Sequence, residues 1–217
     1  MTFDLFDSLP QDAPRAEPIV PGAVVLRGFA REHEQTLLDN VRAIATQAPW
    51  RHLVTPGGLR MSVAMTNCGQ FGWVSDITGY RYEAADPLSG QPWPGMPDAF
   101  LALARDAAAT AGFADFRPDA CLLNRYAPGT RLSLHQDRDE LDLRAPIVSV
   151  SLGLPAVFLF GGLARAERPL HVRLAHGDVV VWGGPARLAF HGIAPLADGD
   201  HALVGRERIN LTFRKTR

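Results

Sequence analysis

The sequence predicts an α+β fold that is mainly β, with a sandwich or barrel of short strands preceded by two helices. After Pro118, short β-branched and apolar segments alternate with Gly and Pro turns, a pattern typical of a sandwich or barrel. Before Pro118, two stretches carry apolar residues at helical spacing. The 217 residues show no internal repeat and no linker. We therefore expect a single domain.

The N-terminal half provides the helices and the first strands. Apolar residues at helical spacing between Glu32 and Gln47 predict an amphipathic helix, which Pro49 ends. A second helix is expected from Pro97, which suits a first turn, to Gly112, which suits a C-terminal cap. The other expected elements are an irregular arm over residues 1–20, a strand over 23–26, a turn over 55–58 and a half-buried strand over 61–66.

Residues 67–96 show no helix or strand pattern but are rich in Gly, Pro and aromatic residues. A loop of this length in a compact domain is usually functional or disordered. The aromatic content argues against disorder. Two interpretations remain open: a coil packed by its own side chains, and a lid that faces a substrate.

The C-terminal half is expected to consist of strands. The expected strands cover residues 120–126, 147–152, 156–160, 171–174, 178–182, 188–191 and 208–213. In the last of them the polar side chains share one face and the apolar side chains share the other, because side chains alternate along a strand. This is either an edge strand with its polar face in water or a doubly cationic face that points into a barrel and holds a dianion.

Composition excludes several classes of protein. The 47% apolar and 21% charged fractions are ordinary for a globular protein, no apolar run reaches the roughly 18 residues of a membrane helix, and the acidic N-terminus does not resemble a signal peptide. We expect a cytoplasmic protein with no membrane partner. The net charge of −1 argues against bulk electrostatic coating of nucleic acid. Cys68 and Cys121 have no metal or redox spacing and are expected in the core.

The pattern His135-Gln-Asp137 follows a Pro-Gly turn and is the first candidate site. In an extended segment residues two apart project from the same face, so an imidazole and a carboxylate can converge on one ion. Alone, this pattern is weak. His191 could supply a third ligand, and two histidines with one carboxylate suit a non-haem Fe(II) oxygenase with open metal positions.

The polar face of the last strand extends this site. Arg208 and Arg214 lie on that face with Asn210, and arginine binds carboxylates through two parallel hydrogen bonds. On another expected strand, Asn124 and Tyr126 share a face with Leu122. A metal that needs a chelating keto acid, together with two arginines for its carboxylates, points to 2-oxoglutarate.

These motifs resemble the AlkB family of nucleic-acid dealkylases. The resemblance rests on Asn124-Arg-Tyr126, His135-Gln-Asp137, His191, Arg208-x-Asn210-x-x-x-Arg214, Thr55-Pro-Gly-Gly58, Met61-Ser-Val-Ala-Met-Thr-Asn-Cys-Gly69, Ser149-Val-Ser-Leu-Gly153 and Asp178-Val-Val-Val-Trp-Gly-Gly184, in order and at family spacing from about residue 20 onwards. It implies one catalytic domain over residues 1–217. That domain would hold a substrate-recognition lid at about 50–96 and a jelly-roll (double-stranded β-helix) core at about 118–214.

The resemblance also implies a role for each site residue. His135, Asp137 and His191 would bind Fe(II), and 2-oxoglutarate would contact Asn124, Tyr126, Arg208, Asn210 and Arg214, with O₂ as the other co-substrate. Trp73 and the ring of His135 would sandwich a flipped base. Tyr80 would contact phosphate, and Asp139 would lie near the exocyclic amine of the base. Among the substrate-binding residues, Arg165 would influence substrate preference, and Thr55 and Met61 would line the lid. One departure is Leu59, where an aromatic residue is expected.

The implied function is oxidative repair of DNA. N-methyl groups on bases such as 1-methyladenine and 3-methylcytosine would leave as formaldehyde, with succinate and CO₂ as co-products. The implied partner is alkylated single- or double-stranded DNA, with RNA as a further candidate, bound by a monomer. Two alternatives are an oxygenase that hydroxylates a protein or small molecule, against which Trp73 and the lid motifs argue, and a non-catalytic jelly-roll module, which would not need this metal site.

Overall fold

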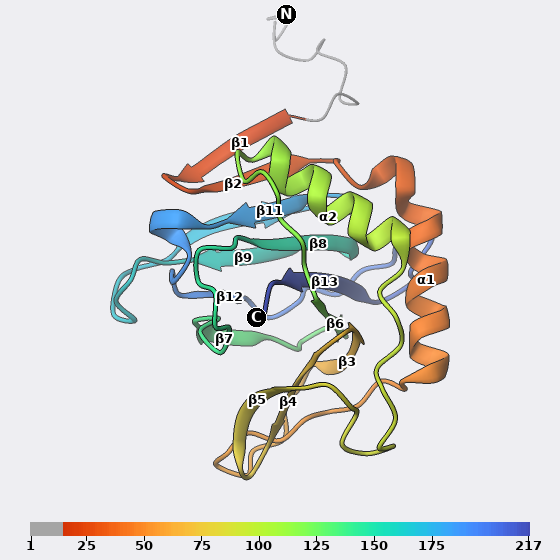
Figure 1. The fold of residues 1–217 in the computed structure, drawn as a ribbon. Helices are drawn as coiled ribbons and strands as arrows, with labels where there is room; N and C mark the ends of the chain where they lie inside the picture. Colours follow the sequence, from red (N-terminus) through yellow and green to blue (C-terminus); the bar gives the residue numbers. More distant parts are fainter. Residues whose placement is uncertain (1–14) are drawn as a thin grey trace, which may run out of the picture.

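The computed structural model describes residues 15–217, which form two β-sheets packed face to face, a hairpin and two helices (Figure 1). The larger sheet has seven strands in the order β1-β2-β11-β8-β13-β6-β3, and the smaller has four in the order β10-β9-β12-β7. The strands are β1 (Arg15–Val20), β2 (Ala23–Arg27), β3 (Ala64–Gly69), β4 (Gly72–Asp76), β5 (Gly79–Glu83), β6 (Ala120–Tyr126), β7 (Leu132–His135), β8 (Ile147–Gly153), β9 (Ala156–Phe160), β10 (Leu170–Leu174), β11 (Val179–Trp182), β12 (His191–Ile193) and β13 (Arg208–Arg214). This is the expected mainly β jelly roll.

Two hydrophobic cores hold the layers together. The helices α1 (Glu34–Gln47) and α2 (Asp98–Thr110) pack on one face of the larger sheet (Figure 1). There Leu37 and Phe100 meet sheet residues such as Leu211. The second core lies between the two sheets and contains Phe158 and Trp182. Burying each such side chain contributes about 1.5–3 kcal/mol to the free energy of folding. The packed sheets therefore hold the polar residues between them in fixed positions.

The strand β13 lies in the interior of the larger sheet. It pairs with β6 on one side and β8 on the other, antiparallel in both cases. Every residue of β13 is buried. Its apolar face packs against the helices, so its polar face points between the sheets. The edge-strand interpretation of this segment is therefore wrong, because neighbouring strands and the second sheet cover it.

Most expected elements are present. Both helices are confirmed, and β6 and β9 have the expected bounds. The strand expected over 61–66 begins three residues later, as β3. The strand expected over 188–191 is wrong: the backbone N–H groups of Ala189 and Phe190 donate to Ala186 and Gly162 outside any strand ladder, and β12 begins at His191.

The irregular arm expected over residues 1–20 is wrong for its last six residues. Residues 15–20 form β1, which pairs antiparallel with β2. Pro18 is compatible with a strand here because β1 is at the edge of its sheet, where one side of the backbone needs no partner. The first part of the expected arm, residues 1–14, lies outside the described residues.

Residues 67–96 are more ordered than their sequence predicts. They contain the end of β3 and the hairpin of β4 and β5, which extends beyond the β3 edge of the larger sheet (Figure 1). Gly72 lies against Trp93, where a Cβ would come within 2.3 Å of the indole ring. Trp73 points into the cavity described below. One face of the hairpin thus packs on protein and the other lines the cavity. Neither face is a purely solvated one, so the alternation that predicts a half-buried strand is missing.

No helix in the described part of the chain is long and apolar enough to cross a membrane.

Candidate metal centre and co-substrate pocket

A cavity of about 800 Å³ opens between the two sheets beneath the β4–β5 hairpin. All of the residues assigned to a site from the sequence line it. They are Thr55, Met61, Trp73, Tyr80, Asn124, Tyr126, His135, Asp137, Asp139, Arg165, His191, Arg208, Asn210 and Arg214. Folding thus brings together residues that lie up to 159 positions apart (55 to 214).

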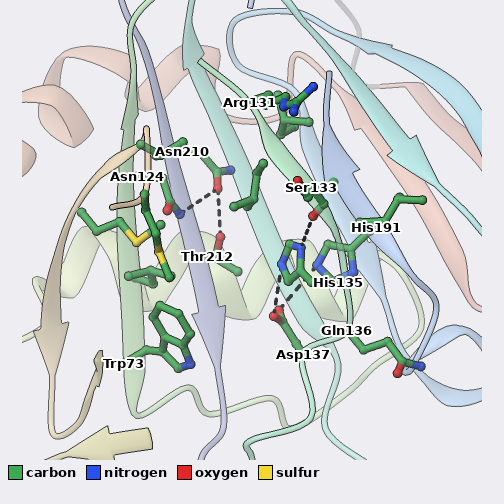
Figure 2. Close-up of a pocket in the computed structure, with 18 of the residues that line it drawn as sticks. Trp73, Asn124, Arg131, Ser133, His135, Gln136, Asp137, His191, Asn210 and Thr212 are labelled. Carbon is green, nitrogen blue, oxygen red and sulfur yellow. Dashed lines mark hydrogen bonds and ion pairs between the residues drawn. The ribbon is translucent and has the colours of Figure 1, made fainter. Parts of the chain in front are cut away.

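The candidate metal ligands lie on neighbouring segments of the smaller sheet (Figure 2). His135 is the last residue of β7 and His191 the first of β12, and the two are direct partners in the antiparallel register. Asp137 follows two residues after β7. One ligand atom from each of the three lies within 4.8 Å of the others. This spacing allows all three to coordinate a single ion.

Backbone contacts orient both imidazoles toward that point. The Nδ1 atom of His135 lies 2.9 Å from the carbonyl of Ser133, and the Nδ1 atom of His191 lies 3.0 Å from that of Ala189. A carbonyl can only accept, so each Nδ1 carries the proton and each Nε2 presents a lone pair. Both Nε2 atoms are 3.7 Å from the carboxylate of Asp137. Two imidazole nitrogens and one carboxylate fit Fe(II).

Electrostatics keep His191 and Asp137 in the protonation states that a metal needs. Burial, reinforced by the nearby His135, lowers the pKa of His191 to about 4, so its imidazole is neutral. Burial opposes ionisation of Asp137, but Arg214 and the two histidines outweigh it and hold the pKa of that carboxyl well below its usual range. Arg214 donates from Nε and Nη2 to Oδ2 alone, at 2.9 and 2.6 Å. Within the described chain Oδ1 accepts no hydrogen bond and is available to an ion.

Arg208 lies at the closed end of the cavity and has an incomplete set of partners. Its side chain is 1% exposed, and its Nη2 donates to the Ser151 hydroxyl at 2.9 Å. Its guanidinium also lies over the ring of Tyr126, 5.0 Å from the centroid. Nε and Nη1 have no partner among the described residues. An unpaired buried cation is unfavourable, so this end of the cavity fits an anion such as a carboxylate.

Two asparagines lie beside Arg208 and are partners across β6 and β13 (Figure 2). Asn210 donates to the Ser149 hydroxyl at 2.8 Å and to the Val150 carbonyl at 2.9 Å, and it accepts from Thr212. These bonds fix its orientation. The Oδ1 atom of Asn124 is buried without a partner in the described chain. The floor of the cavity is therefore polar, preoriented and partly unsatisfied, as a binding site for a small polar acid requires.

The mouth of the cavity carries an aromatic pair from the hairpin. The rings of Trp73 and Tyr80 are stacked with centroids 5.5 Å apart, and Trp73 donates from Nε1 to Asp139 at 2.9 Å. A planar ring beside a carboxylate suits a flat, cationic ligand. The expected contact of a base between Trp73 and His135 stays a prediction, since Trp73 contacts Tyr80 and Asp139 in this structure.

Sequence reasoning missed several polar residues around the site. Buried Glu140 accepts from the Tyr82 hydroxyl at 2.6 Å and pairs with Arg187 at 3.0 Å and with Arg214 at 3.4 Å. Gln136, between two expected ligands, donates to the Leu188 carbonyl at 2.6 Å. No spacing pattern marks a single buried acid or arginine, so only the fold reveals these contacts.

Fold and site together define the class of protein. Two packed sheets that hold two histidines and an aspartate near a buried arginine are the arrangement of an Fe(II)/2-oxoglutarate oxygenase, and the profile of the 2OG-Fe(II) oxygenase superfamily matches residues 22–214. The chain is 58% identical over 211 residues to the alpha-ketoglutarate-dependent dioxygenase AlkB of Salmonella typhimurium, covering 97% of this chain and 98% of that protein. Identity to AlkB of Escherichia coli K12 is 55% over the same shares of the two chains.

A solved structure of OsALKBH1 has the same fold, with a TM-score of 0.81 and 27% identity over 93% of this chain and all of that one. The chain belongs to the AlkB family of the 2OG-Fe(II) oxygenase superfamily. It is therefore an Fe(II)- and 2-oxoglutarate-dependent dioxygenase, as its sequence predicts.

Proposed function

We propose that this enzyme is an oxidative DNA dealkylase that removes N-methyl groups from bases such as 1-methyladenine and 3-methylcytosine. Formaldehyde, succinate and CO₂ would be the products. The observation that carries the proposal is the composition of one cavity. At its closed end are the ligand set and an arginine, Arg208, that has two donors without a partner in the described part of the chain. At its mouth are a stacked aromatic pair, a carboxylate and exposed arginines. Membership of the AlkB family supports the same conclusion.

The closed end of the cavity would hold the iron and the co-substrate. His135, Asp137 and His191 are the proposed iron ligands. Arg208, with its two unpartnered donors, would bind a carboxylate of 2-oxoglutarate, assisted by Tyr126, Asn124 and Asn210. When bound, iron and 2-oxoglutarate would provide the chemistry by which O₂ oxidises a methyl group. The residues themselves orient the two groups and keep water away from them.

Arg214 would act beside both groups. Its guanidinium is directed at Asp137 and Glu140 in this structure, and both partners are carboxylates. It would therefore hold the proposed metal ligand ionised and in place, and present its remaining donor to the co-substrate. Its pKa is raised well above the usual range because the neighbouring carboxylates outweigh burial, so it remains a cation throughout.

The mouth of the cavity would hold the flipped base. A base inside a duplex cannot reach the closed end, so it must be extruded or already single-stranded. Stacking on an aromatic ring contributes about 1–3 kcal/mol per base, and Trp73 and Tyr80 provide that surface. A methyl group on N1 of adenine or N3 of cytosine makes the base cationic. Asp139, held by Trp73 at 2.9 Å, would favour the cation over the unmodified base.

A rim of four arginines would contact the nucleic-acid backbone. Arg60, Arg131, Arg138 and Arg165 line the cavity and are exposed, and none of them forms an ion pair within the described chain. Net charge is only −1, so this positive charge is local. Phosphate contacts position a substrate without reading its sequence. The alternative, an oxygenase acting on a small molecule, gives this rim and the aromatic pair no role.

The test is formaldehyde release from an oligonucleotide that contains 3-methylcytosine, with Fe(II), ascorbate and 2-oxoglutarate. The same oligonucleotide without the methyl group is the substrate control. The Asp137→Ala variant is expected to lose turnover through weakened iron binding. Succinate formation without formaldehyde would contradict the DNA proposal and favour another substrate class. Full activity of Asp137→Ala would contradict the assignment of that ligand.

The finer features of the function are also proposals. We propose that residues at about 50–96 serve as the lid, since Thr55, Met61, Trp73 and Tyr80 all reach the cavity from that stretch. The remaining expectations are a single catalytic domain, a monomer, action on single- and double-stranded DNA with RNA as a further substrate, and a cytoplasmic location where DNA is accessible. The formaldehyde assay repeated on methylated DNA and RNA of both forms tests the substrate range.

A further inference from the structure

Asp137 differs from the two histidines in what holds its backbone. His135 and His191 are fixed by the ladder between β7 and β12. Asp137 lies beyond the end of β7, in a stretch over residues 136–140 that belongs to no helix or strand. A ligand in such a segment needs other contacts to hold it, because a metal site depends on the orientation of each donor.

Arg187 provides such contacts from the segment that leads to His191. Its Nη1 donates to the Asp137 carbonyl at 2.7 Å, and its Nε donates to the Ala145 carbonyl at 3.0 Å. Its Nη2 donates to the Glu140 carboxylate at 3.0 Å. The three bonds span the whole loop from 137 to 145. We call Arg187 and these three partners the Arg187 clasp.

A second bond runs in the opposite direction between the same two segments. Gln136, which lies between the two ligands of the first segment, donates to the Leu188 carbonyl at 2.6 Å. Leu188 directly follows Arg187. Figure 2 shows Gln136 directed away from the histidine pair. The segment with Asp137 and the segment with His191 therefore each donate hydrogen bonds to the other, next to the proposed metal position.

Arg187 does not itself belong to the cavity. It is 3% exposed and is absent from the cavity lining, as is Glu140. It therefore contacts neither the substrate nor the co-substrate. The planar guanidinium supplies donors in several fixed directions, which a lysine ammonium on a flexible stem cannot reproduce. The geometry of the clasp thus depends on arginine at this position.

We propose that Arg187 is a positioning residue for the metal centre. By holding the Asp137 carbonyl and the Glu140 carboxylate, it fixes the loop so that the Asp137 carboxylate faces the two Nε2 atoms. Glu140 also contacts Arg214 at 3.4 Å, and Arg214 contacts the Asp137 carboxylate. The clasp thus constrains this ligand at its backbone directly and at its side chain through one intermediate. Losing it should weaken metal binding.

The test measures Mn(II) binding, with no substrate present. The full-length protein is stripped with a chelator and titrated with Mn(II), and free Mn(II) is followed by electron paramagnetic resonance. Arg187→Lys is expected to raise the Mn(II) dissociation constant by about 10–100-fold, the usual cost of losing a contact that orients a metal ligand. Arg144→Lys is the matched control, because the exposed Arg144 has Asp142 as its sole hydrogen-bond and ion-pair partner within residues 15–217.

A second variant separates positioning from folding. Removing Arg187 alone leaves the buried Glu140 charge poorly paired, which can impair folding. The double variant Arg187→Met/Glu140→Gln removes both charges and retains the side-chain volumes. It is expected to give a cooperative thermal transition and the same weakened Mn(II) binding. Parental Mn(II) affinity in both variants, whatever the change in melting temperature, would show a purely structural role and overturn the proposal.

The inference rests on the proposed metal site, and Asp137→Ala distinguishes the failure of each. If Asp137→Ala loses Mn(II) affinity and the Arg187 variants retain it, the ligand assignment stands and the clasp is refuted. If Asp137→Ala binds Mn(II) like the parent, the ligand assignment fails and the clasp fails with it. Neither outcome depends on which methylated substrate the enzyme accepts.

Discussion

Replacing Arg208 by methionine should change co-substrate affinity and stability in opposite directions. Methionine fills a similar volume without a charge. In the free protein the change removes a buried guanidinium whose Nε and Nη1 have no partner among the described residues. Burial already lowers the pKa of this group, a sign that its charge is poorly compensated. Replacing buried charge by an apolar group is often neutral or stabilising by about 1–4 kcal/mol, so the free variant should melt no lower than the parent.

The effect on 2-oxoglutarate is expected to be large. Each hydrogen bond to a charged group contributes about 1.5–3 kcal/mol, and two such donors are available on Arg208. Their loss amounts to roughly 3–6 kcal/mol, and since about 1.4 kcal/mol corresponds to a factor of ten, affinity should fall by about two to four orders of magnitude. The parent should gain about 2.7 kcal/mol of stability at a ligand concentration 100 times its dissociation constant. The variant should gain almost none.

Calorimetric titration with 2-oxoglutarate and thermal unfolding with and without it measure both effects. Arg206→Met is the matched control, because Arg206 lies two residues earlier and pairs with Asp198 on the surface. It should bind the co-substrate like the parent. A dissociation constant for Arg208→Met within threefold of the parent would refute the assignment of Arg208. A strongly lowered melting temperature of the free variant would refute the argument that its charge is uncompensated.

Three further substitutions test the lid and its attachment. Trp73→Ala should raise KM for a 3-methylcytosine oligonucleotide by a factor that matches about 1–3 kcal/mol of lost stacking, while succinate formation without substrate stays at the parental rate. Gly72→Ala should destabilise by about 1–3 kcal/mol, because its Cβ would meet the Trp93 ring at 2.3 Å, whereas Gly95→Ala, with open space, should be neutral in denaturant unfolding. Asp86→Asn should cost about 1.5–3 kcal/mol at pH 7, because the amide has no charge and keeps only one of the two oxygens that accept from Arg51. Because Arg51 lowers the pKa of Asp86, the parent's advantage should persist above the unfolded pKa near 3.9 and disappear as pH falls through the folded value; a constant difference in unfolding free energy would count against this pair.

The fold was predictable where the spacing of apolar residues agrees with the Pro and Gly residues that end an element. The helix stop at Pro49, the cap at Gly112 and the alternation of β13 indicate their elements without reference to the rest of the chain. The hairpin around Trp73 was not predictable in this way, because one of its faces packs on protein and the other lines the cavity. Its sequence pattern is therefore neither helical nor alternating. β1 was missed for a related reason, since Pro18 excludes a central strand and only the topology shows that β1 is at an edge.

The site shows the same division. His135 and Asp137 could be found because two ligands on one extended segment leave a spacing pattern, and the polar face of β13 follows from alternation alone. Arg187, Glu140 and Gln136 leave no such pattern. The contacts of Arg187 and Gln136 join residues that are 42 to 52 positions apart, and each depends on how two loops meet after the sheets have formed. Sequence spacing therefore identifies residues that touch a ligand more readily than residues that position those residues.

The charges along the cavity alternate with depth, and this order separates the ligands. Arg208, 1% exposed, is deepest, Asp137 with its partner Arg214 lies next at 9% exposed, and Asp139 is exposed near the mouth. An anionic keto acid is stabilised at the closed end, where two donors of Arg208 have no partner among the described residues. A cationic methylated base is instead stabilised beside Asp139, which Trp73 holds near the mouth. Because charges interact more strongly where water is excluded, the deeply buried Arg208 distinguishes most sharply between an anionic and a cationic ligand. The polar sequence of one strand and one loop thereby sets which ligand occupies which end.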